Sequence, residues 1–419
     1  MSINRETIQN TAKNLRQIFP PTPLVRSDFL SQHYQADIYL KREDTTVVRS
    51  YKIRGAYNFI HTTLEKSDNK NPLFVCASAG NHAQGFAFSC AHFQISGVVF
   101  MPITTPAQKI DRTREFGKNF ITIELVGDTF DQCNQAAQKF CEEKSGTFVP
   151  PFDHDWIVAG QGTVAAEISE QVPKTLDIIL VPIGGGGLCS GIVSWYRDAA
   201  DAPKIFGVEP EGAASLHESL RQNQRVKLEE ITTFVDGASV AQIGEKPWEI
   251  LSSYFSSADQ IKKIPENRLC QTMIDFLHHD GLVLEPAGAL AIDALQSFSH
   301  QEIKGKTIIC IVSGSNFDFD RLPEVKERAA KYAGKKKYFI VPFPQRPGAL
   351  RDFLQCLGPE DDITRFEYLK KSARNFGSVL LGIETKKPQN FISLMENMKK
   401  SGFSFRDVTN DEILADFLV

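Results

Sequence analysis

The stretch Arg49-Ser50-Tyr51-Lys52-Ile53-Arg54-Gly55-Ala56 places one lysine directly before a predicted amphipathic helix, Ala56 to Leu64. An amine held beside cations and a helix N-terminus loses its proton more easily than one in bulk water, and a neutral amine forms imines with aldehydes. Arg49, Arg54 and the helix end all favour the neutral form of Lys52. The alternative is a solvated surface lysine, which is the common state of this residue type. By itself the stretch leaves both interpretations open.

A polar turn, Ser78-Ala79-Gly80-Asn81-His82, follows the apolar run Leu73 to Cys76 and precedes a helical pattern, Ala83 to His92. Backbone amides and a short polar side chain at such a turn form a nest that binds anionic oxygens. The alternative is a plain strand-to-helix turn with Asn81 as the helix cap. Ser78 and Asn81 are therefore candidate site residues.

Four consecutive glycines occur in Gly184-Gly185-Gly186-Gly187-Leu188, between a predicted strand, Asp177 to Pro182, and the helical Ser190 to Asp198. Such backbone is costly unless a group must approach the main chain closely, and a phosphate at the following helix N-terminus is a common reason. Neither the P-loop nor the dinucleotide Gly-x-Gly-x-x-Gly spacing is present, which favours a phosphomonoester over a nucleotide. A mobile loop is the alternative.

A third polar turn, Ser313-Gly314-Ser315-Asn316, ends the apolar predicted strand Thr307 to Val312. A hydroxyl at this place can hydrogen-bond a heterocyclic nitrogen without giving it a formal proton, although a plain turn would look the same. Pyridoxal 5'-phosphate needs an amine for its aldehyde, a partner for its ring oxygen, a cradle for its phosphate and a partner for its ring nitrogen. The four segments together match those needs.

These segments, together with Glu285-Pro286-Ala287-Gly288-Ala289, resemble the motifs of the biosynthetic threonine dehydratases, also called threonine deaminases, of the fold-type II pyridoxal phosphate enzymes. The resemblance runs from about Gln17 to the C-terminus. Individual motifs are shared with serine dehydratases and serine racemases, but the set is specific. The resemblance implies an α/β fold in which two open, twisted parallel sheets enclose the cofactor.

Residue roles follow from the same resemblance. It implies that Lys52 forms the imine with the cofactor, that Asn81 meets the ring 3'-oxygen, and that Ser313 faces the pyridine nitrogen, while the loop Gly184 to Leu188 binds the phosphate. It also places Glu285 near the ring, although its position directly before a helix that starts with proline favours a capping role.

The implied reaction is the conversion of L-threonine to 2-oxobutanoate and ammonia, with L-serine as an alternative substrate. Lys52 would remove the α-proton, and the turn that contains Ser78 would hold the substrate carboxylate. The activity would begin isoleucine biosynthesis and be inhibited by isoleucine. Two alternatives stay open: a degradative serine/threonine dehydratase, and a non-catalytic amino-acid sensor that has kept the cofactor fold.

A divalent-cation site of some relatives is matched only in part. Glu209 and Ala213 agree with it, but Ser215 stands where an aspartate is expected. Hard cations prefer several carboxylate oxygens. We therefore predict no metal.

Composition places the chain among globular enzymes with more than one domain. Its 419 residues are 42% hydrophobic, and chains of this length usually divide into two or three units. A net charge of -4 gives no basic footprint for nucleic acid, and no apolar run approaches the roughly 20 residues that cross a bilayer. The eight cysteines are scattered without a Cys-x-x-Cys pair, which predicts reduced thiols in a cytoplasmic protein.

Strand-like runs alternate with helical patterns through most of the chain, which predicts parallel sheets covered on both faces. Ligands of such sheets collect at the carboxyl ends of the strands, where the three polar turns lie. We expect a catalytic domain over residues 1–333, with a small subdomain over about 56–152. The predicted strands are Ile38 to Leu40, Leu73 to Cys76, Gly97 to Met101, Phe120 to Leu125, Asp177 to Pro182, Lys204 to Glu209 and Thr307 to Val312.

The C-terminal residues 334–419 predict a separate domain with a ferredoxin-like strand–helix–strand–strand–helix–strand order. Its first loop, Pro344 to Leu350, resembles the turn of the ACT-like regulatory domains of threonine dehydratases, which implies isoleucine or valine as effectors. One such module needs a copy from another subunit to complete a site, so a homodimer or homotetramer is expected. The alternative is a domain that only stabilises assembly.

Overall fold

The computed structural model describes residues 3–69, 71–369 and 376–411. The chain divides into two compact units. The first comprises Met1–Glu266 and Phe276–Asp318, and the second comprises Asn267–Asp275 and Phe319–Val419. The domain boundary after residue 333 stays a prediction.

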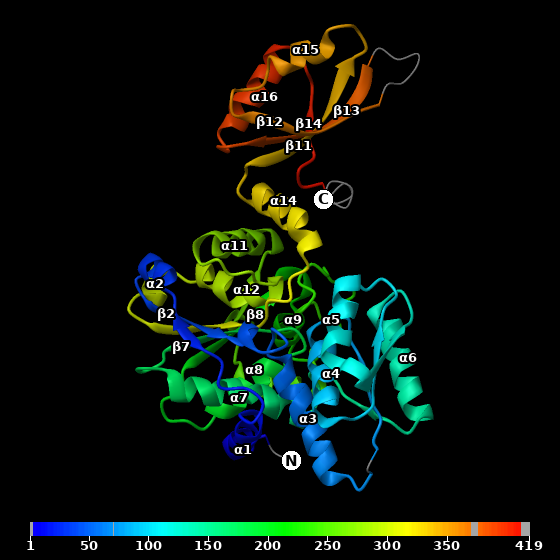
Figure 1. Cartoon of the computed structure of the whole chain (residues 1–419). Coiled ribbons are helices and arrows are strands. Elements are labelled where there is room, and N and C mark those ends of the chain that lie inside the picture. The colour runs from blue at the N-terminus through cyan, green and yellow to red at the C-terminus, as the bar shows by residue number, and fades with distance from the viewer. Residues whose placement is uncertain (1–2, 70, 370–375, 412–419) are drawn as a thin grey trace. The chain divides into compact units, whose positions relative to one another are not determined.

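The first unit contains a six-stranded sheet in the order β1-β2-β10-β7-β8-β9. All neighbouring strands are parallel except β1, which is antiparallel to β2. The central strands are apolar on both faces because helices cover both: α7 and α8 lie on one side and α12 on the other (Figure 1). The strands are β1 Leu24–Arg26, β2 Asp37–Arg42, β7 Ile178–Pro182, β8 Lys204–Pro210, β9 Ile261–Ile264 and β10 Thr307–Val312.

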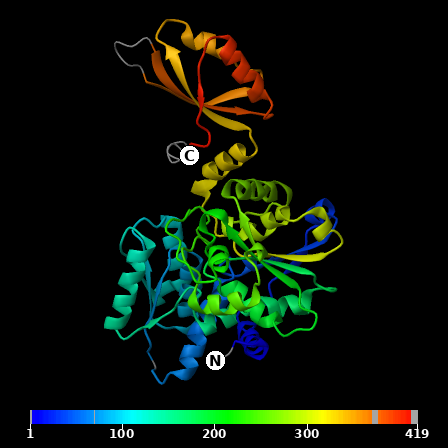
Figure 2. The ribbon, with the colours of Figure 1, turned by 180° about the vertical axis from the view of Figure 1, so that it is seen from behind.

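A second, four-stranded parallel sheet in the same unit has the order β5-β4-β3-β6. Alternate residues of β3 reach the two faces: Phe74 and Cys76 pack with α3, α4 and α5, whereas Val75 and Ala77 pack with α6. Figure 2 shows this sheet between its helices from behind. Its strands are β3 Phe74–Ala77, β4 Gly97–Met101, β5 Ile121–Leu125 and β6 Thr147–Phe148.

Thirteen α-helices begin in the described part of the first unit. Their bounds are α1 Arg5–Leu15, α2 Asp28–Tyr34, α3 Lys52–Lys66, α4 Asn81–Phe93, α5 Ala107–Gly117, α6 Phe130–Glu143, α7 Asp155–Gln171, α8 Gly187–Tyr196, α9 Ser215–Gln222, α10 Glu245–Tyr254, α11 Glu266–His279, α12 Pro286–Asp293 and α13 His300–Ile303.

The predicted strands of this unit are confirmed, with ends that differ by a few residues. Three short strands, β1, β6 and β9, were not predicted because two to four residues give no clear period. A further difference matters for function: α3 begins at Lys52 rather than at Ala56. The lysine therefore lies in the first helical turn and not in the preceding loop.

The second unit contains an antiparallel sheet in the order β12-β13-β11-β14, and its element order after α14 is the predicted strand–helix–strand–strand–helix–strand. Its core is rich in phenylalanine, because Phe339, Phe343, Phe353, Phe391 and Phe403 are all buried between sheet and helices. The third element of that order was predicted as a strand over Ile363 to Lys370, of which Lys370 lies outside the described residues. The elements are α14 Leu322–Tyr332, β11 Lys336–Pro344, α15 Ala349–Leu354, β12 Asp361–Leu369, β13 Phe376–Thr385, α16 Asn390–Lys400 and β14 Arg406–Asp407.

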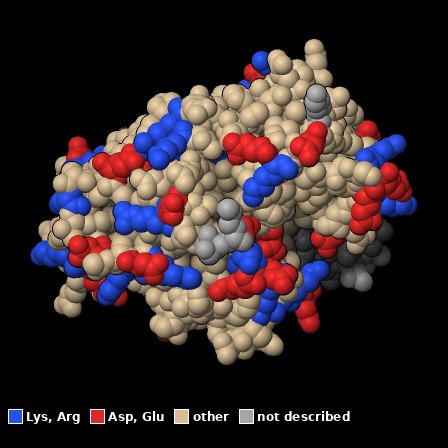
Figure 3. All heavy atoms as spheres, turned by 90° about the horizontal axis from the view of Figure 1, so that it is seen from below, with Lys and Arg blue, Asp and Glu red and all other residues tan. Residues whose placement is uncertain are grey.

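Two surface properties accompany this fold. Within the described ranges, no helix has both the length and the apolar character needed to cross a bilayer. On the face shown in Figure 3, acidic and basic side chains are interspersed and neither sign forms a continuous patch.

Candidate active site

Lys52 is the first residue of α3, and its side chain is half-buried. The Nζ atom donates a 2.9 Å hydrogen bond to the carbonyl oxygen of Pro151 and lies 5.4 Å and 5.9 Å from the ring centres of Tyr51 and Phe152. Burial lowers the pKa of Lys52 to about 8, although the Glu285 carboxyl opposes the shift. A substantial fraction of this amine is therefore neutral near pH 8, as a nucleophile or base requires.

The lowered pKa of Lys52 was predicted, but its cause was not. Neither Arg49 nor Arg54 is responsible, because the shift comes from burial. The Arg54 guanidinium is itself fully buried and is bound by the carboxylates of Glu43 and Glu167. Its charge is compensated within that cluster.

Ser313 lies beside Lys52, directly after the end of β10. The Tyr51 amide donates to the Ser313 carbonyl oxygen over 3.1 Å, and the Ser315 amide donates to the Arg49 carbonyl oxygen over 3.0 Å. Ser50 and Gly314 form a β-bridge between the same two segments. The Ser313 side chain is buried. The structure thus brings the predicted ring-nitrogen partner next to the lysine.

The four-glycine loop approaches the lysine through Phe152. A Cβ atom on Gly185 would lie 2.2 Å from the Phe152 ring, the same ring that lies near Lys52. Gly186 has a φ of 89°, which favours glycine, and α8 begins at the next residue. The first helical bond runs from the Ser190 amide to the Gly186 carbonyl oxygen, so the preceding amides are donors for an anion.

Asn81 and Glu285 contact each other, although they are 204 residues apart in the sequence. The Asn81 Nδ2 atom donates to Glu285 Oε1 over 2.7 Å, and Asn81 Oδ1 accepts from Asn316 Nδ2 over 2.7 Å. Asn316 also donates to the Val48 carbonyl oxygen over 2.8 Å. Asn316 belongs to a predicted turn, but the sequence assigned it no role, since only the tertiary contact with Asn81 reveals one.

Both capping interpretations are wrong. The cap of α4 is Gly80, and Asn81 is the first helical residue, with its side chain directed to Glu285. Glu285 does occupy the cap position of α12, but its side chain caps no amide of that helix. Burial raises the pKa of Glu285 to about 8, and the nearby Asp236 adds to the shift. The side chain of Glu285 therefore lies against Asn81, another residue of the candidate site.

The turn that contains Ser78 lies against the start of α3. The Gly80 amide donates to Ser78 Oγ over 3.2 Å, so the hydroxyl already satisfies one amide of the predicted nest. Helix α4 follows this turn and packs tightly on α3, because a Cβ on Gly85 would lie 3.0 Å from the backbone of Ile53. The turn is thereby held near Lys52.

The residues fit pyridoxal 5'-phosphate. A half-buried amine of lowered pKa, a glycine loop at a helix N-terminus and a buried serine hydroxyl gather around Phe152 and the 313–316 turn. Asn81 uses one of its amide hydrogens on Glu285, which leaves the second for a ring oxygen. Lys52, the glycine loop, Asn81 and Ser313 are the residues that would hold the cofactor.

Glu209, part of the incomplete cation motif, serves another purpose. Its carboxylate accepts from the amides of Leu216 and His217 over 2.8 Å and 2.9 Å, at the start of α9. Burial raises its pKa to about 8, against those two hydrogen bonds. Within the described ranges, no group of three histidine, cysteine or acidic side chains is arranged to hold a metal ion.

A cavity of about 470 Å³ lies beside α9, and none of the predicted site residues lines it. It is lined by Glu211, Gly212, Ala214, His217, Glu218, Leu228, Glu230, Ile231, Thr232 and Lys263.

Comparison with known proteins agrees with this geometry. Residues 15–314 match the family described as pyridoxal-phosphate dependent enzyme, and residues 327–418 match the C-terminal regulatory domain of threonine dehydratase. The biosynthetic L-threonine dehydratase IlvA of Halalkalibacterium halodurans is 44% identical over 100% of this chain and 99% of its own length. The chain belongs to the biosynthetic threonine dehydratases.

The homologue in Bacillus subtilis is 45% identical over 97% of this chain and 95% of its own length. The processed form of threonine deaminase isoform 2 from Solanum lycopersicum superposes with a TM-score of 0.71 and 33% identity, over 77% of this chain and 93% of that one. The predicted family, fold class, cofactor and enzyme class are thus confirmed: a fold-type II, pyridoxal-phosphate-dependent lyase with a C-terminal regulatory domain.

Proposed function

We propose that this enzyme converts L-threonine to 2-oxobutanoate and ammonia at the site around Lys52, as the first step of isoleucine biosynthesis. The observation that carries the proposal is the Lys52 amine, which is half-buried with a pKa of about 8 and lies beside Ser313 and Phe152. Full-length similarity to enzymes named biosynthetic L-threonine dehydratase supports the choice of substrate.

Each residue has a proposed part in this reaction. Pyridoxal phosphate supplies an electron sink that acidifies the substrate Cα–H. Lys52 Nζ accepts that proton, which its lowered pKa permits near neutral pH. The amides of the loop Gly184 to Leu188 bind a phosphate, Asn81 and Ser313 orient the ring, and the Ser78 turn binds the substrate carboxylate. The protonated Glu285 carboxyl supports Asn81.

The second unit is proposed to bind isoleucine or valine and to regulate the first. Its support is the match of residues 327–418 to a threonine dehydratase regulatory domain. Because it contains a single ferredoxin-like module, we propose that two copies from different subunits complete an effector site in a homodimer or homotetramer. All eight cysteines are buried thiols without disulfides, which supports a reducing cytoplasmic location.

Substitution of Lys52 tests the proposed site. Lys52→Ala should abolish 2-oxobutanoate formation and the visible absorption of the lysine–cofactor imine, because Lys52 Nζ is the amine proposed to form that imine and to accept the substrate proton. Lys66→Ala is the matched control, since Lys66 lies in the last turn of the same helix, over the Trp156 ring at 4.6 Å. The control should keep both signals.

Steady-state rates on L-threonine and L-serine then separate the alternatives. A biosynthetic enzyme should prefer L-threonine and respond to isoleucine. Equal rates on both substrates without an isoleucine effect would favour a degradative dehydratase, and imine absorption without turnover would favour a sensor. Full activity of Lys52→Ala would contradict the assigned site.

A further inference from the structure

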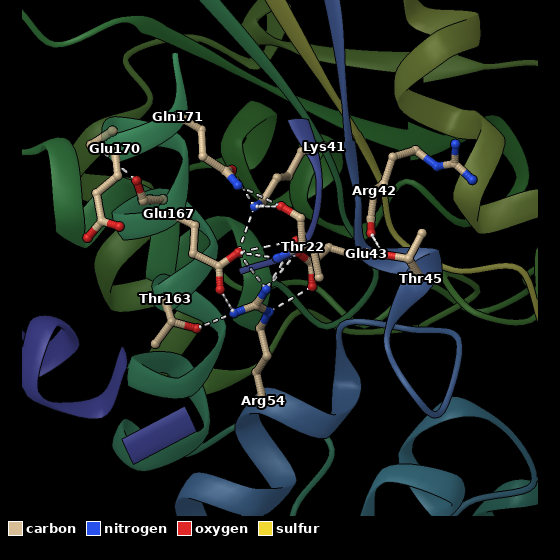
Figure 4. Close-up of polar contacts among 12 residues, drawn as sticks. Thr22, Lys41, Arg42, Glu43, Thr45, Arg54, Thr163, Glu167, Glu170 and Gln171 are labelled. Carbon is tan, nitrogen blue, oxygen red and sulfur yellow. Dashed lines mark hydrogen bonds and ion pairs between the residues drawn. The ribbon is translucent and has the colours of Figure 1, made fainter. Parts of the chain in front are cut away.

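Helix α3, which begins at Lys52, also carries Arg54. Arg54 lies in a buried cluster of four charged side chains: Lys41, Glu43, Arg54 and Glu167 (Figure 4). Lys41, Glu43 and Arg54 have no exposed side-chain surface, and Glu167 keeps 5%. Two cations face two carboxylates, so the cluster is neutral as a whole. None of the four has a place in the proposed chemistry.

Arg54 is the centre of this cluster. Its Nε and Nη2 atoms donate to the two oxygens of Glu43 over 2.7 Å and 2.9 Å. Its Nη1 and Nη2 atoms donate to the two oxygens of Glu167 over 2.6 Å and 2.9 Å. The planar guanidinium is therefore held on two sides, each time by a pair of hydrogen bonds to one carboxylate. Such bidentate pairs fix the orientation of the guanidinium as well as its distance.

The remaining polar atoms of the cluster come from distant segments. Lys41 Nζ donates to Glu167, to the Thr22 carbonyl oxygen and to Gln171 over 2.6 Å, 2.7 Å and 2.8 Å. Thr163 Oγ1 accepts from Arg54 over 2.9 Å. The cluster thus joins α3 to β2, to the turn after it and to α7.

Such a cluster is better suited to fixing geometry than to adding stability. Taking charges out of water costs several kcal/mol per ion, and well-packed apolar side chains of similar volume are often as stabilising. Although burial opposes them, Glu43 and Glu167 raise the pKa of Arg54, and Arg54 and Lys41 hold the pKa of Glu167 at about 2. The shifts keep the pair of Arg54 and Glu167 ionised. The directional hydrogen bonds of the cluster are the property that apolar packing lacks.

Arg54 lies two residues after Lys52 on α3, so the two side chains point about 200° apart around the helix axis. Because the hydrogen bonds of Arg54 fix the rotation of α3 on one side of the helix, they also fix the direction of the Lys52 amine on the other side. Close backbone contact restricts the helix further. A Cβ on Gly55 would lie 2.3 Å from the Gln161 side chain, and a Cβ on Gly160 would lie 2.5 Å from the Arg54 carbonyl oxygen.

We propose that Arg54, held by Glu43 and Glu167, is a positioning residue that fixes the rotation of the first turn of α3 and thereby directs the Lys52 amine to the cofactor. Lys41, Thr22 and Thr163 complete the anchor. The inference rests on the proposed role of Lys52, but it concerns a different group of residues.

Arg54→Lys tests the positioning, because it keeps the charge and removes the fork. Competitive labelling of the cofactor-free full-length chain with acetic anhydride, followed by mass spectrometry of the Lys52 peptide, gives the pH midpoint of this one amine. The parent midpoint should lie near 8. We expect a rise of about one pH unit or more in Arg54→Lys, since a mobile amine gains water. The affinity for pyridoxal phosphate, titrated by visible absorbance, should fall about tenfold.

Arg42→Lys is the matched control. Arg42 also forms a forked pair, with Asp44 over 2.8 Å and 2.7 Å, but its side chain points away from the cluster (Figure 4). In Arg42→Lys, the pH midpoint of Lys52 labelling and the affinity for pyridoxal phosphate should equal those of the parent. Thermal unfolding of each variant shows whether a changed pH midpoint of Lys52 merely accompanies a general loss of stability.

A second pair guards against a variant that fails to fold. Glu167→Gln removes the charge that two cations share, whereas Glu170→Gln, on the same helix, removes an exposed pair with Arg16. Only Glu167→Gln should raise the Lys52 midpoint. Parent-like midpoints in folded Arg54→Lys and Glu167→Gln would overturn the inference, even if unfolding temperatures fell. Imine absorption retained in Lys52→Ala would instead overturn the proposed function.

Discussion

At the scale of single residues, the chemistry of the site depends on contacts between side chains that are remote in sequence. Glu285 shows this most directly. Its position before Pro286 predicts a helix cap, yet its carboxyl is buried and accepts from Asn81. A negative charge at a helix start is stabilised by at most about 2 kcal/mol, and a carboxyl that burial keeps protonated carries no such charge.

The raised pKa of Glu285 predicts a pH-dependent stability. The folded chain keeps this proton up to a pKa of about 8, whereas the unfolded chain loses it near 4.5, so the folded state binds more protons between these values. Stability must then fall as pH rises through that window, by up to about 1.4 kcal/mol per pH unit. Glu285→Gln should make this slope shallower by the share of Glu285, while Glu209, whose pKa is also raised to about 8, keeps its own share. Urea unfolding of parent and variant over the window measures the difference, and identical slopes would contradict the assignment.

Asn316 is predicted to orient Asn81. Asn316→Ala removes a donor to Asn81 Oδ1, and the loss of one such hydrogen bond should lower kcat/KM about tenfold. Asn316→Asp should be worse, because it offers only acceptors and Asn81 must turn its amide over. Steady-state kinetics with both variants gives the order. An Asn316→Asp enzyme more active than Asn316→Ala would argue against this role.

At the scale of elements, the loop Gly184 to Leu188 was predicted from its glycines, and the structure shows why glycine is required at one position in particular. A Cβ atom on Gly185 would lie 2.2 Å from the Phe152 ring, so a side chain has no space at this position of the loop. In contrast, the start of α3 was misplaced by four residues. The amphipathic period is clear only after Ala56, whereas the first turn is fixed by the tertiary contacts of Arg54.

Substitutions within the glycine loop should differ in severity. In Gly185→Ala the new Cβ would lie 2.2 Å from the Phe152 ring, so either loop or ring must move, at a cost of about 1 to 3 kcal/mol. In Gly187→Ala the nearest atoms of Phe152 are 3.2 Å away. Cofactor affinity, titrated by absorbance, should fall about tenfold or more in Gly185→Ala and much less in Gly187→Ala. Equal cofactor affinities of the two variants would mean that the Phe152 ring can move aside without any effect on cofactor binding.

At the scale of the whole molecule, the proposed active site and the proposed regulation belong to separate units. Lys52, Asn81, the glycine loop, Glu285 and Ser313 all belong to the first unit, which has its own buried cores. The second unit has a distinct phenylalanine-rich core. This separation allows one activity to be removed without the other.

Removal of residues 335–419 should therefore leave 2-oxobutanoate formation and abolish any effect of isoleucine or valine. The measurement is the steady-state rate on L-threonine, with and without each effector, for the truncated and the full-length chain. Equal isoleucine inhibition of both chains would place the effector site in the first unit. Loss of all activity, together with a shift to monomers on gel filtration, would support the alternative that the second unit stabilises assembly.

The sequence by itself determined the strand and helix alternation, the order of the three polar turns, the lysine and the ferredoxin-like C-terminal order, because all of these follow from local periodicity and turn chemistry. Only the tertiary structure decided why the Lys52 amine is activated and how Glu285 and Arg54 are used. Burial beside Phe152, the contact of Asn81 with Glu285 across 204 residues and that of Arg54 with Glu167 across 113 depend on segments far apart in the chain. Desolvation and side-chain pairing over such distances leave no local pattern.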